Sequence, residues 1–139
     1  MTSLYVRDYM NMRPVIFSPE MSLSAALDKL LTSKQIGGPV VDAEHRVVGF
    51  LSEQDMIETL LKVGYSCQDS YSVTDCMSAQ VLTANPEDSI MVLAEQMTIK
   101  KPKIYPVVAS DGNLVGVISR RDVLSAIGNQ ITHGFQHPV

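Results

Sequence analysis

The chain alternates between segments with helical spacing of apolar residues and short runs that are rich in β-branched residues. Apolar side chains recur at i, i+3 and i+4 in four segments, and this spacing predicts helices. These helices span residues 22–33, 53–63, 89–99 and 120–128. Apolar runs bounded by Pro, Gly and polar residues predict strands between the helices. These strands span residues 15–17, 39–41, 47–51, 81–84, 106–109 and 114–118.

The elements follow the order β-α-β-β-α, and this order occurs twice. In each copy a short polar turn joins the second strand to the third, so we predict an antiparallel hairpin. The turn at 110–113 contains Asp111 and Gly112, a dipeptide typical of tight hairpin turns. Since the helices are expected to cover one face of each hairpin, the predicted fold class is α/β (α+β).

The two halves of the chain are copies of one another. The register is a shift of 67 positions: Pro-Val-Val at 39–41 falls on 106–108, and V-x-D-x-M at 6–10 falls on 73–77. A unit of about 60 residues buries too little surface to be stable alone. We therefore predict that the copies pack face to face about a pseudo-twofold axis. The first copy is assigned to 1–66 and the second to 67–139, with a polar linker at 64–72.

One motif, G-h-h-S-x-x-D with h apolar, ends the last strand of each copy, at 49–55 and at 116–122. In one interpretation the motif is a helix cap. The Ser oxygen would accept from a free helix amide, the acid would reach back to the Ser amide, and the Gly would be a bulge or a close-packing position. In the other interpretation the same geometry binds a nucleotide. The Asp would accept from a ribose diol and the Ser hydroxyl would donate to a phosphate at the helix N-terminus.

The repeat resembles a tandem pair of CBS domains, the regulatory module named after cystathionine β-synthase. The resemblance rests on Pro-Val-Val followed about ten residues later by G-h-h-S-x-x-D, with V-x-D-x-M before the first strand, in both copies. It covers residues 4–129. It implies a compact module with two pseudo-equivalent clefts that bind adenosyl compounds: AMP, ADP, ATP or S-adenosylmethionine. It also implies a homodimer that regulates an effector protein and carries no catalysis of its own.

The resemblance assigns roles to residues of both copies. The ribose would be held by Asp55 and Asp122, and the phosphate region would be contacted by Ser52 and Ser119. The base pocket would be lined by residues of the first strand and by the residue before Pro-Val-Val. These residues are Ile16, Thr83, Gly38 and Tyr105. Tyr105 fits a wall that stacks on adenine, and it fits a dimer contact equally well.

The basic residues of the second copy lie in two clusters, Lys100–Lys103 and Arg120–Arg121. In place of Arg120 the first copy has Glu53, whose charge would repel a phosphate where Arg120 would attract one. We therefore hypothesise that the Asp122 site, with Arg120 and Arg121, binds a phosphorylated adenosine compound. The Asp55 site would bind weakly or prefer a less charged one. Two alternatives stay open: Arg120 could serve the other cleft, and these basic residues could simply form a solvated surface.

Composition narrows the class of protein. The chain has 139 residues with 11 Lys+Arg and 15 Asp+Glu, and its net charge of −4 argues against nucleic-acid binding. No stretch has the roughly 18–20 consecutive apolar residues of a membrane span, and the first residues, 1–8, lack the apolar core expected of a secretion signal. The two cysteines, Cys67 and Cys76, are expected to be ordinary thiols of a reduced, soluble, cytoplasmic protein. His133 and His137 lie in an expected loose tail, and we predict no metal site.

Together with the resemblance, these observations predict a stand-alone sensor that binds an adenosyl nucleotide as a regulatory ligand and requires no cofactor. No enzyme signature occurs, since the chain lacks G-x-S-x-G, a Gly-rich phosphate loop and H-E-x-x-H. The main alternative is a ligand-free dimerisation or scaffold module in which S-x-x-D only caps helices. An enzyme that acts on a nucleotide is a further alternative.

Overall fold

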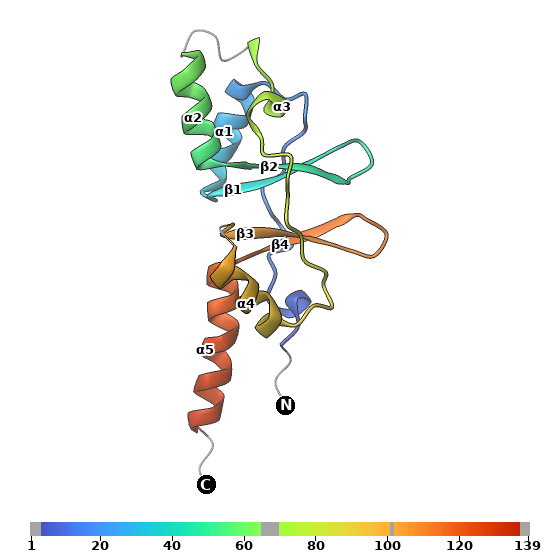
Figure 1. The fold of residues 1–139 in the computed structure, drawn as a ribbon, viewed down its shortest axis with the longest axis vertical. Helices are drawn as coiled ribbons and strands as arrows, with labels where there is room; N and C mark the ends of the chain where they lie inside the picture. The colour runs from blue at the N-terminus through green and yellow to red at the C-terminus, as the bar shows by residue number, and fades with distance from the viewer. Residues whose placement is uncertain (1–3, 65–69, 101, 137–139) are drawn as a thin grey trace.

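The computed structural model describes residues 4–64, 70–100 and 102–136. It contains two similar units, each made of a two-stranded hairpin and two longer helices. The first unit contains α1 (Leu23–Ser33), β1 (Gly37–Val41), β2 (Val47–Ser52) and α2 (Glu53–Val63). The second contains α4 (Ile90–Ile99), β3 (Ile104–Val108), β4 (Leu114–Ser119) and α5 (Arg120–Gln136). The hairpins face each other at the centre, with α1 and α2 beyond one and α4 and α5 beyond the other (Figure 1).

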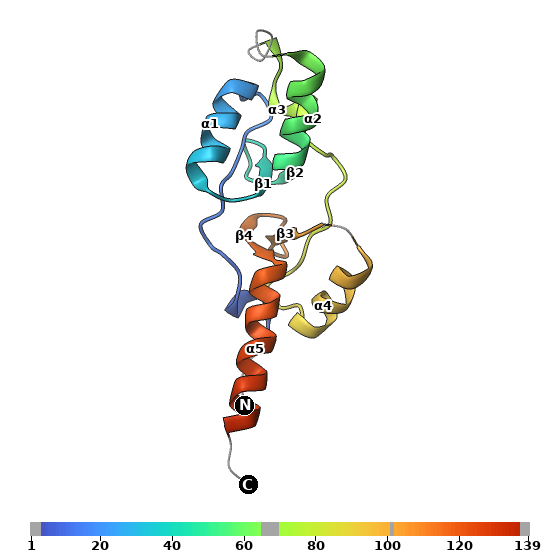
Figure 2. The ribbon, with the colours of Figure 1, turned by 90° about the vertical axis from the view of Figure 1, so that its left-hand side faces the viewer.

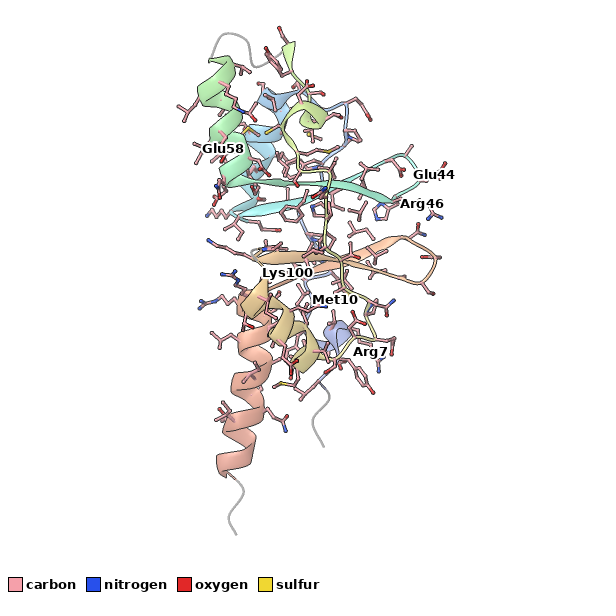
Figure 3. The ribbon with its side chains drawn as sticks, viewed as in Figure 1. Arg7, Met10, Glu44, Arg46, Glu58 and Lys100 are labelled. Atoms are coloured by element: carbon pink, nitrogen blue, oxygen red, sulfur yellow. The ribbon has the colours of Figure 1, made fainter. Side chains whose placement is uncertain are left out.

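The hairpins confirm the predicted repeat in their register. Gly37 pairs with Ser52 in β1–β2, and Ile104 pairs with Ser119 at the equivalent place in β3–β4. Both ladders are antiparallel and shift register at the same point, one residue before the strand ends. Gly112 has φ +91°, the left-handed conformation that the Asp-Gly turn requires. The two hairpin turns lie on the same side of the molecule (Figure 3). The amide of Leu114 donates to the carbonyl of His45 between the two hairpins (3.2 Å).

The strands predicted at 15–17 and 81–84 are not strands in the structure. Each segment contributes one isolated parallel bridge, Phe17 with Val40 and Ala84 with Val107. Each segment then turns away within two residues, at Pro19 and at Pro86, so that no ladder can extend. Each apolar run therefore pairs with the edge of a hairpin at one residue only and does not form a strand.

The cores of the two units exchange short segments of chain. Val6 belongs to η1 (Val6–Asp8), and it is fully buried among core residues of the second unit, such as Ile90. Val73 belongs to α3 (Val73–Cys76), and it is fully buried in the core of the first unit. Backbone hydrogen bonds hold both segments in place. The amide of Val6 donates to the carbonyl of Asp88 (2.9 Å), and the amide of Val73 donates to the carbonyl of Met21 (2.8 Å). Each V-x-D-x-M segment therefore completes the unit that lies on the opposite side of the molecule.

Helix α5 is longer than the sequence predicted. The expected end at 128 and the expected loose tail at 133–138 are corrected, because the helix continues to Gln136 through Gly128 and Gly134. A helical Gly costs only about 1 kcal/mol relative to Ala, which does not by itself end a helix. The C-terminal part of α5 extends past the other elements (Figure 2). His137 lies outside the described residues.

Within the described residues, no helix combines the length and the apolar character that crossing a membrane requires.

Candidate functional site

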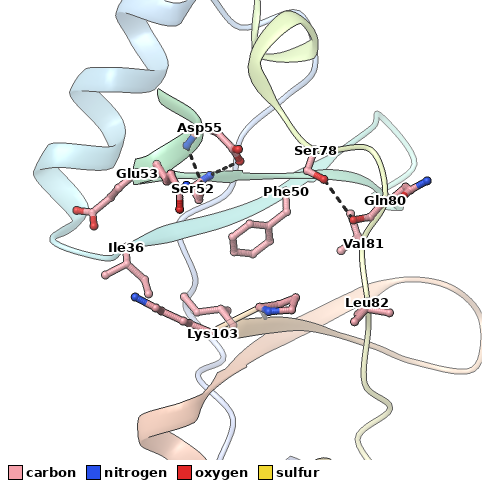
Figure 4. A pocket seen from close by; sticks show the side chains of 13 residues that line it. Ile36, Phe50, Ser52, Glu53, Asp55, Ser78, Gln80, Val81, Leu82 and Lys103 are labelled. Atoms are coloured by element: carbon pink, nitrogen blue, oxygen red, sulfur yellow. Dashed lines mark hydrogen bonds between the residues drawn. The ribbon is translucent and has the colours of Figure 1, made fainter. Parts of the chain in front are cut away.

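A cleft of about 570 Å³ lies between the two units. One wall is formed by the end of β2 and the start of α2, from Phe50 to Asp55. The facing wall is formed by residues 102–104 at the start of β3, and the connecting segment 78–82 closes one side (Figure 4). The cleft is therefore built jointly by both copies of the repeat.

The motif at Ser52 and Asp55 caps helix α2. The amide of Asp55 donates to the Ser52 hydroxyl oxygen (3.1 Å), and the amide of Ser52 donates to Oδ2 of Asp55 (3.2 Å). These reciprocal bonds confirm the interpretation of the motif as a helix cap. No described residue bonds to Oδ1 of Asp55. The cap therefore leaves an acceptor oxygen and a hydroxyl donor on residues that line the cleft.

The motif glycine marks a close approach of the exchanged segment. A Cβ at Gly49 would clash with Sδ of Met77, and a Cβ at Gly116 would lie 2.6 Å from the carbonyl oxygen of Asn11. Met77 is the last residue of one V-x-D-x-M segment, and Asn11 directly follows the other. Glycine is thus needed where these segments cross the last strand of the other unit, which confirms the close-packing interpretation.

Phe50 is a site residue that sequence reasoning missed. It is the one aromatic side chain among the described residues that line the cleft, and its ring lies between the two hairpins (Figure 4). Paired backbone bonds to Ser78, 2.9 Å in each direction, hold its position. A difference between the copies could have indicated it, because Val117 occupies the equivalent place and is buried.

None of the four expected base-pocket residues lines this cleft. Tyr105 is 1% exposed in the core of the second unit, and its hydroxyl has no hydrogen-bond partner among the described residues. Burial raises the pKa of that hydroxyl, and the charge of Arg120 opposes the rise. The reason for its position is strand alternation: Ile104 lines the cleft, so its neighbour Tyr105 points to the opposite face.

The other three expected base-pocket residues also lie outside the walls of this cleft. Gly38 is buried, and a Cβ there would clash with the carbonyl oxygen of Val15. Thr83 is exposed, one residue beyond the lining segment. Ile16 lines a separate, smaller cavity of about 220 Å³ beside α1.

The second motif forms the same cap as the first. The amide of Asp122 donates to the Ser119 hydroxyl oxygen (3.1 Å), and the amide of Ser119 donates to Oδ2 of Asp122 (2.9 Å). Neither of the two cavities described above is lined by any residue of Ser119–Asp122, Arg120 and Arg121 included. One basic residue of the second copy does line a cleft: Lys103 lies on the wall that faces Asp55. The positive charge that the sequence assigned to the second site is therefore partly in the first.

Cys76 connects the exchanged segment to the first turn of α2. It is buried, and its Sγ donates to the backbone carbonyl of Asp55 (3.3 Å) and accepts from the Thr59 hydroxyl (3.1 Å). Burial raises the pKa of this thiol, although the bond from Thr59 opposes the rise. Cys76 thus packs directly behind the aspartate of the motif. Cys67 lies outside the described residues.

Comparisons with known proteins agree with this architecture. A family model for the CBS domain matches the chain twice, over residues 6–62 and 73–129. Among curated relatives, the uncharacterized protein MJ1225 of Methanocaldococcus jannaschii is 26% identical over 124 residues, which are 89% of this chain and 43% of that protein. The uncharacterized protein MJ1426 of the same organism is 24% identical, and the match covers 89% of this chain and 91% of that protein.

Solved structures share the fold over nearly the whole chain. CBSX2 of Arabidopsis thaliana, crystallised in complex with AMP, matches with a TM-score of 0.80 and 27% identity, covering 94% of this chain and 99% of CBSX2. A CBS domain-containing protein from Bacillus anthracis matches with a TM-score of 0.83 and 20% identity, covering 92% and 95% of the two chains. The fold, the exchanged segments and the two tandem family matches lead to one conclusion: the chain belongs to the CBS domain family and contains a tandem pair of CBS domains.

Proposed function

We propose that this CBS pair is a regulatory module. It binds an adenosyl compound (AMP, ADP, ATP or S-adenosylmethionine) in the cleft beside Asp55 and transmits binding to a partner protein. The observation that carries the proposal is a cleft of about 570 Å³ that both copies build and that holds an aromatic ring and an unengaged carboxylate oxygen. This volume is in the range of small-molecule sites, roughly 300–1,000 Å³.

The lining residues suggest how the ligand would lie. A ribose diol would donate to Oδ1 of Asp55, as acidic residues accept ribose hydroxyls in dinucleotide sites. The Ser52 hydroxyl would donate to the 5′ substituent. The base would stack on Phe50, since offset stacking on an aromatic ring is favourable and needs no further polar group. Every one of these groups lies on the wall from β2 to α2.

A relative supports the ligand class. CBSX2 was crystallised with AMP and shares 27% identity over nearly all of its length. The sequence favoured the Asp122 site for a phosphorylated ligand, whereas the cleft of about 570 Å³ lies at Asp55. We therefore assign the primary ligand site to the first motif and keep Asp122, with Ser119 and Arg120, as a second and weaker site.

Signal transmission would follow from the position of the cleft between the units. A ligand that contacts both walls binds one arrangement of the two hairpins more tightly than another and so shifts the population toward it. The effector would be a protein that distinguishes those arrangements.

A homodimer is part of this proposal. Each of the four longer helices leaves at least one large apolar side chain more than half exposed. These side chains include Leu31 (67%), Leu61 (77%), Ile99 (78%) and Leu124 (66%). Contiguous exposed apolar patches are typical of protein–protein contacts, and a homodimer would bury these side chains. Light scattering should give a dimer mass, and replacing Leu61 and Leu124 together by Lys should give a monomer.

The scaffold alternative has its own support, because both S-x-x-D motifs form complete helix caps without any ligand. A thermal-shift screen separates the two functions. AMP, ADP, ATP, S-adenosylmethionine and GMP are added to protein freed of carried-over ligand. A ligand at 100 times its dissociation constant adds about 2.7 kcal/mol to the stability of the folded state. A rise with adenosyl compounds alone supports the sensor, and no rise with any compound supports the scaffold.

Two variants locate the site. Asp55→Asn retains the shape of the cap and should weaken adenosyl binding about 10- to 100-fold, the value of a hydrogen bond to a charged group. Asp122→Asn is the matched control and should have a much smaller effect. An affinity lost in Asp122→Asn and retained in Asp55→Asn would return the primary site to the second motif.

A further inference from the structure

Two opposite charges stand at one end of the cleft. Glu53 is the first residue of α2 and Lys103 precedes β3, so they lie on facing walls. Their side chains point toward the same end of the cleft (Figure 4). Both are exposed, and neither forms an ion pair with any described residue. Each charge is therefore available to a ligand whose adenosine part lies deeper, beside Asp55.

The first turn of α2 offers little to a chain of phosphates. A helix N-terminus binds phosphate through its free amides. Here the amide of Glu53 donates to the carbonyl of Ile36 (3.0 Å), and the amide of Asp55 donates to Ser52 (3.1 Å). Two of the first three amides of α2 are thus already used, and the side chain that follows the cap is a carboxylate.

We propose that this cleft selects an adenosyl ligand whose 5′ substituent carries both an ammonium and a carboxylate, and that Glu53 and Lys103 determine that selectivity. The inference rests on the proposed function and specifies its ligand class. Glu53 binds the ammonium and Lys103 binds the carboxylate, each as a charge-assisted pair. A polyphosphate meets one favourable charge, on Lys103, and two unfavourable ones, on Glu53 and Asp55.

The second copy shows that this backbone arrangement accepts either a negative or a positive side chain at the position of Glu53. Arg120 occupies the place of Glu53. Its amide donates to the backbone carbonyl of Lys103 (2.9 Å), just as the amide of Glu53 donates to the backbone carbonyl of Ile36 (3.0 Å). The caps behind the two residues are also alike. Placing Arg at 53 therefore reproduces an arrangement that this fold already contains, which makes Glu53→Arg a suitable test.

Isothermal titration calorimetry with S-adenosylmethionine, adenosine and ATP tests the inference. The native protein should bind S-adenosylmethionine at least about tenfold more tightly than either adenosine or ATP, since one charge-assisted pair is sufficient for that ratio. Glu53→Arg should reverse the preference between S-adenosylmethionine and ATP. Lys103→Gln should weaken S-adenosylmethionine and leave adenosine unchanged. The control is Glu95→Arg, which makes the same charge change on the exposed surface of α4, outside the cleft.

The outcomes separate this inference from the proposed function. If ATP binds best and Glu53→Arg changes nothing, the selectivity is overturned and the adenosyl site stands. If S-adenosylmethionine and adenosine bind equally, the charged end of the cleft does not contact the ligand and the inference fails. If none of the three compounds binds, both the site and its selectivity are overturned. A shift as large in Glu95→Arg as in Glu53→Arg assigns the effect to net charge and also overturns the inference.

Discussion

At several positions in this molecule, the residue type depends on which distant segment packs against it or on whether it faces the cleft. Gly49 lies under the Met77 side chain, and Phe50 beside it faces the open cleft. A plain periodicity argument treats both as strand residues and cannot separate them. It also cannot foresee the position of Tyr105, because which face of a strand meets a cleft depends on how the units pack. The Ser and Asp of the motif are different, since a helix cap is a local interaction and could be predicted from four residues.

The close approach at Gly49 predicts a destabilised variant. Gly49→Ala should lower the free energy of unfolding by about 1–3 kcal/mol, the usual cost of overpacking a buried site. Gly128→Ala is the control. Its added Cβ meets nothing within 4 Å, and it lies inside α5. There alanine should stabilise by up to about 1 kcal/mol through helix propensity. Urea denaturation measures both, and equal effects would contradict the role of close packing.

The buried thiol of Cys76 predicts a pH dependence. Its pKa is raised in the folded state, chiefly by burial, so the protonated form is favoured there. That contribution to stability is fully present below the unfolded pKa of the thiol and is lost as pH rises toward the folded one. In a Cys67→Ser background, stability should fall between about pH 8 and pH 10, the range around an ordinary thiol pKa. Cys76→Ala in that background should remove this part of the slope.

At the scale of elements, the sequence predicted those whose signals are local. Both hairpins and the helices α1, α2 and α4 begin and end close to the expected residues, because caps, turns and apolar spacing act within a few residues. Helix α5 begins at the expected residue but continues to Gln136. The exceptions depend on distant contacts. The run at 15–17 forms a single bridge because the chain turns away from the hairpin at Pro19. The helix α3 (Val73–Cys76) was missed because four residues carry no periodicity.

The two equivalent caps make a matched pair of elements. Ser52→Ala and Ser119→Ala should each cost about 1 kcal/mol of stability, because each removes the acceptor for one helix amide. Only Ser52→Ala should also weaken adenosyl binding, since only Ser52 lines the cleft. Urea denaturation measures the first effect and calorimetry the second. Loss of binding in both variants would show that the ligand depends on overall stability and not on this hydroxyl.

At the scale of the whole molecule, the exchanged segments connect the two units, because each segment packs in the core of the other unit. The 67-residue repeat was evident in the sequence, but the sequence cannot say which copy a segment docks against. The structure resolves this with core contacts: Val6 packs in the second unit and Val73 in the first. The ion pair of Arg7 with Glu87 adds little beside them, because both side chains are largely exposed. The predicted boundary between 66 and 67 divides the sequence repeats, while each core draws on both halves.

This exchange predicts that neither unit can unfold alone. Val6→Ala removes two buried methyl groups from the second unit and should cost roughly 2 kcal/mol. Val73→Ala should cost a similar amount in the first unit, since both side chains are fully buried. If the units are coupled, each variant lowers the denaturation midpoint of the whole chain and leaves one cooperative transition.

Far-UV circular dichroism follows the helices of both units. The difference in tyrosine fluorescence from a Tyr105→Phe variant reports on the buried Tyr105, which lies in the second unit. Coincident transitions support a single folding unit, and a Val73→Ala variant that unfolds in two steps would show that the units are independent.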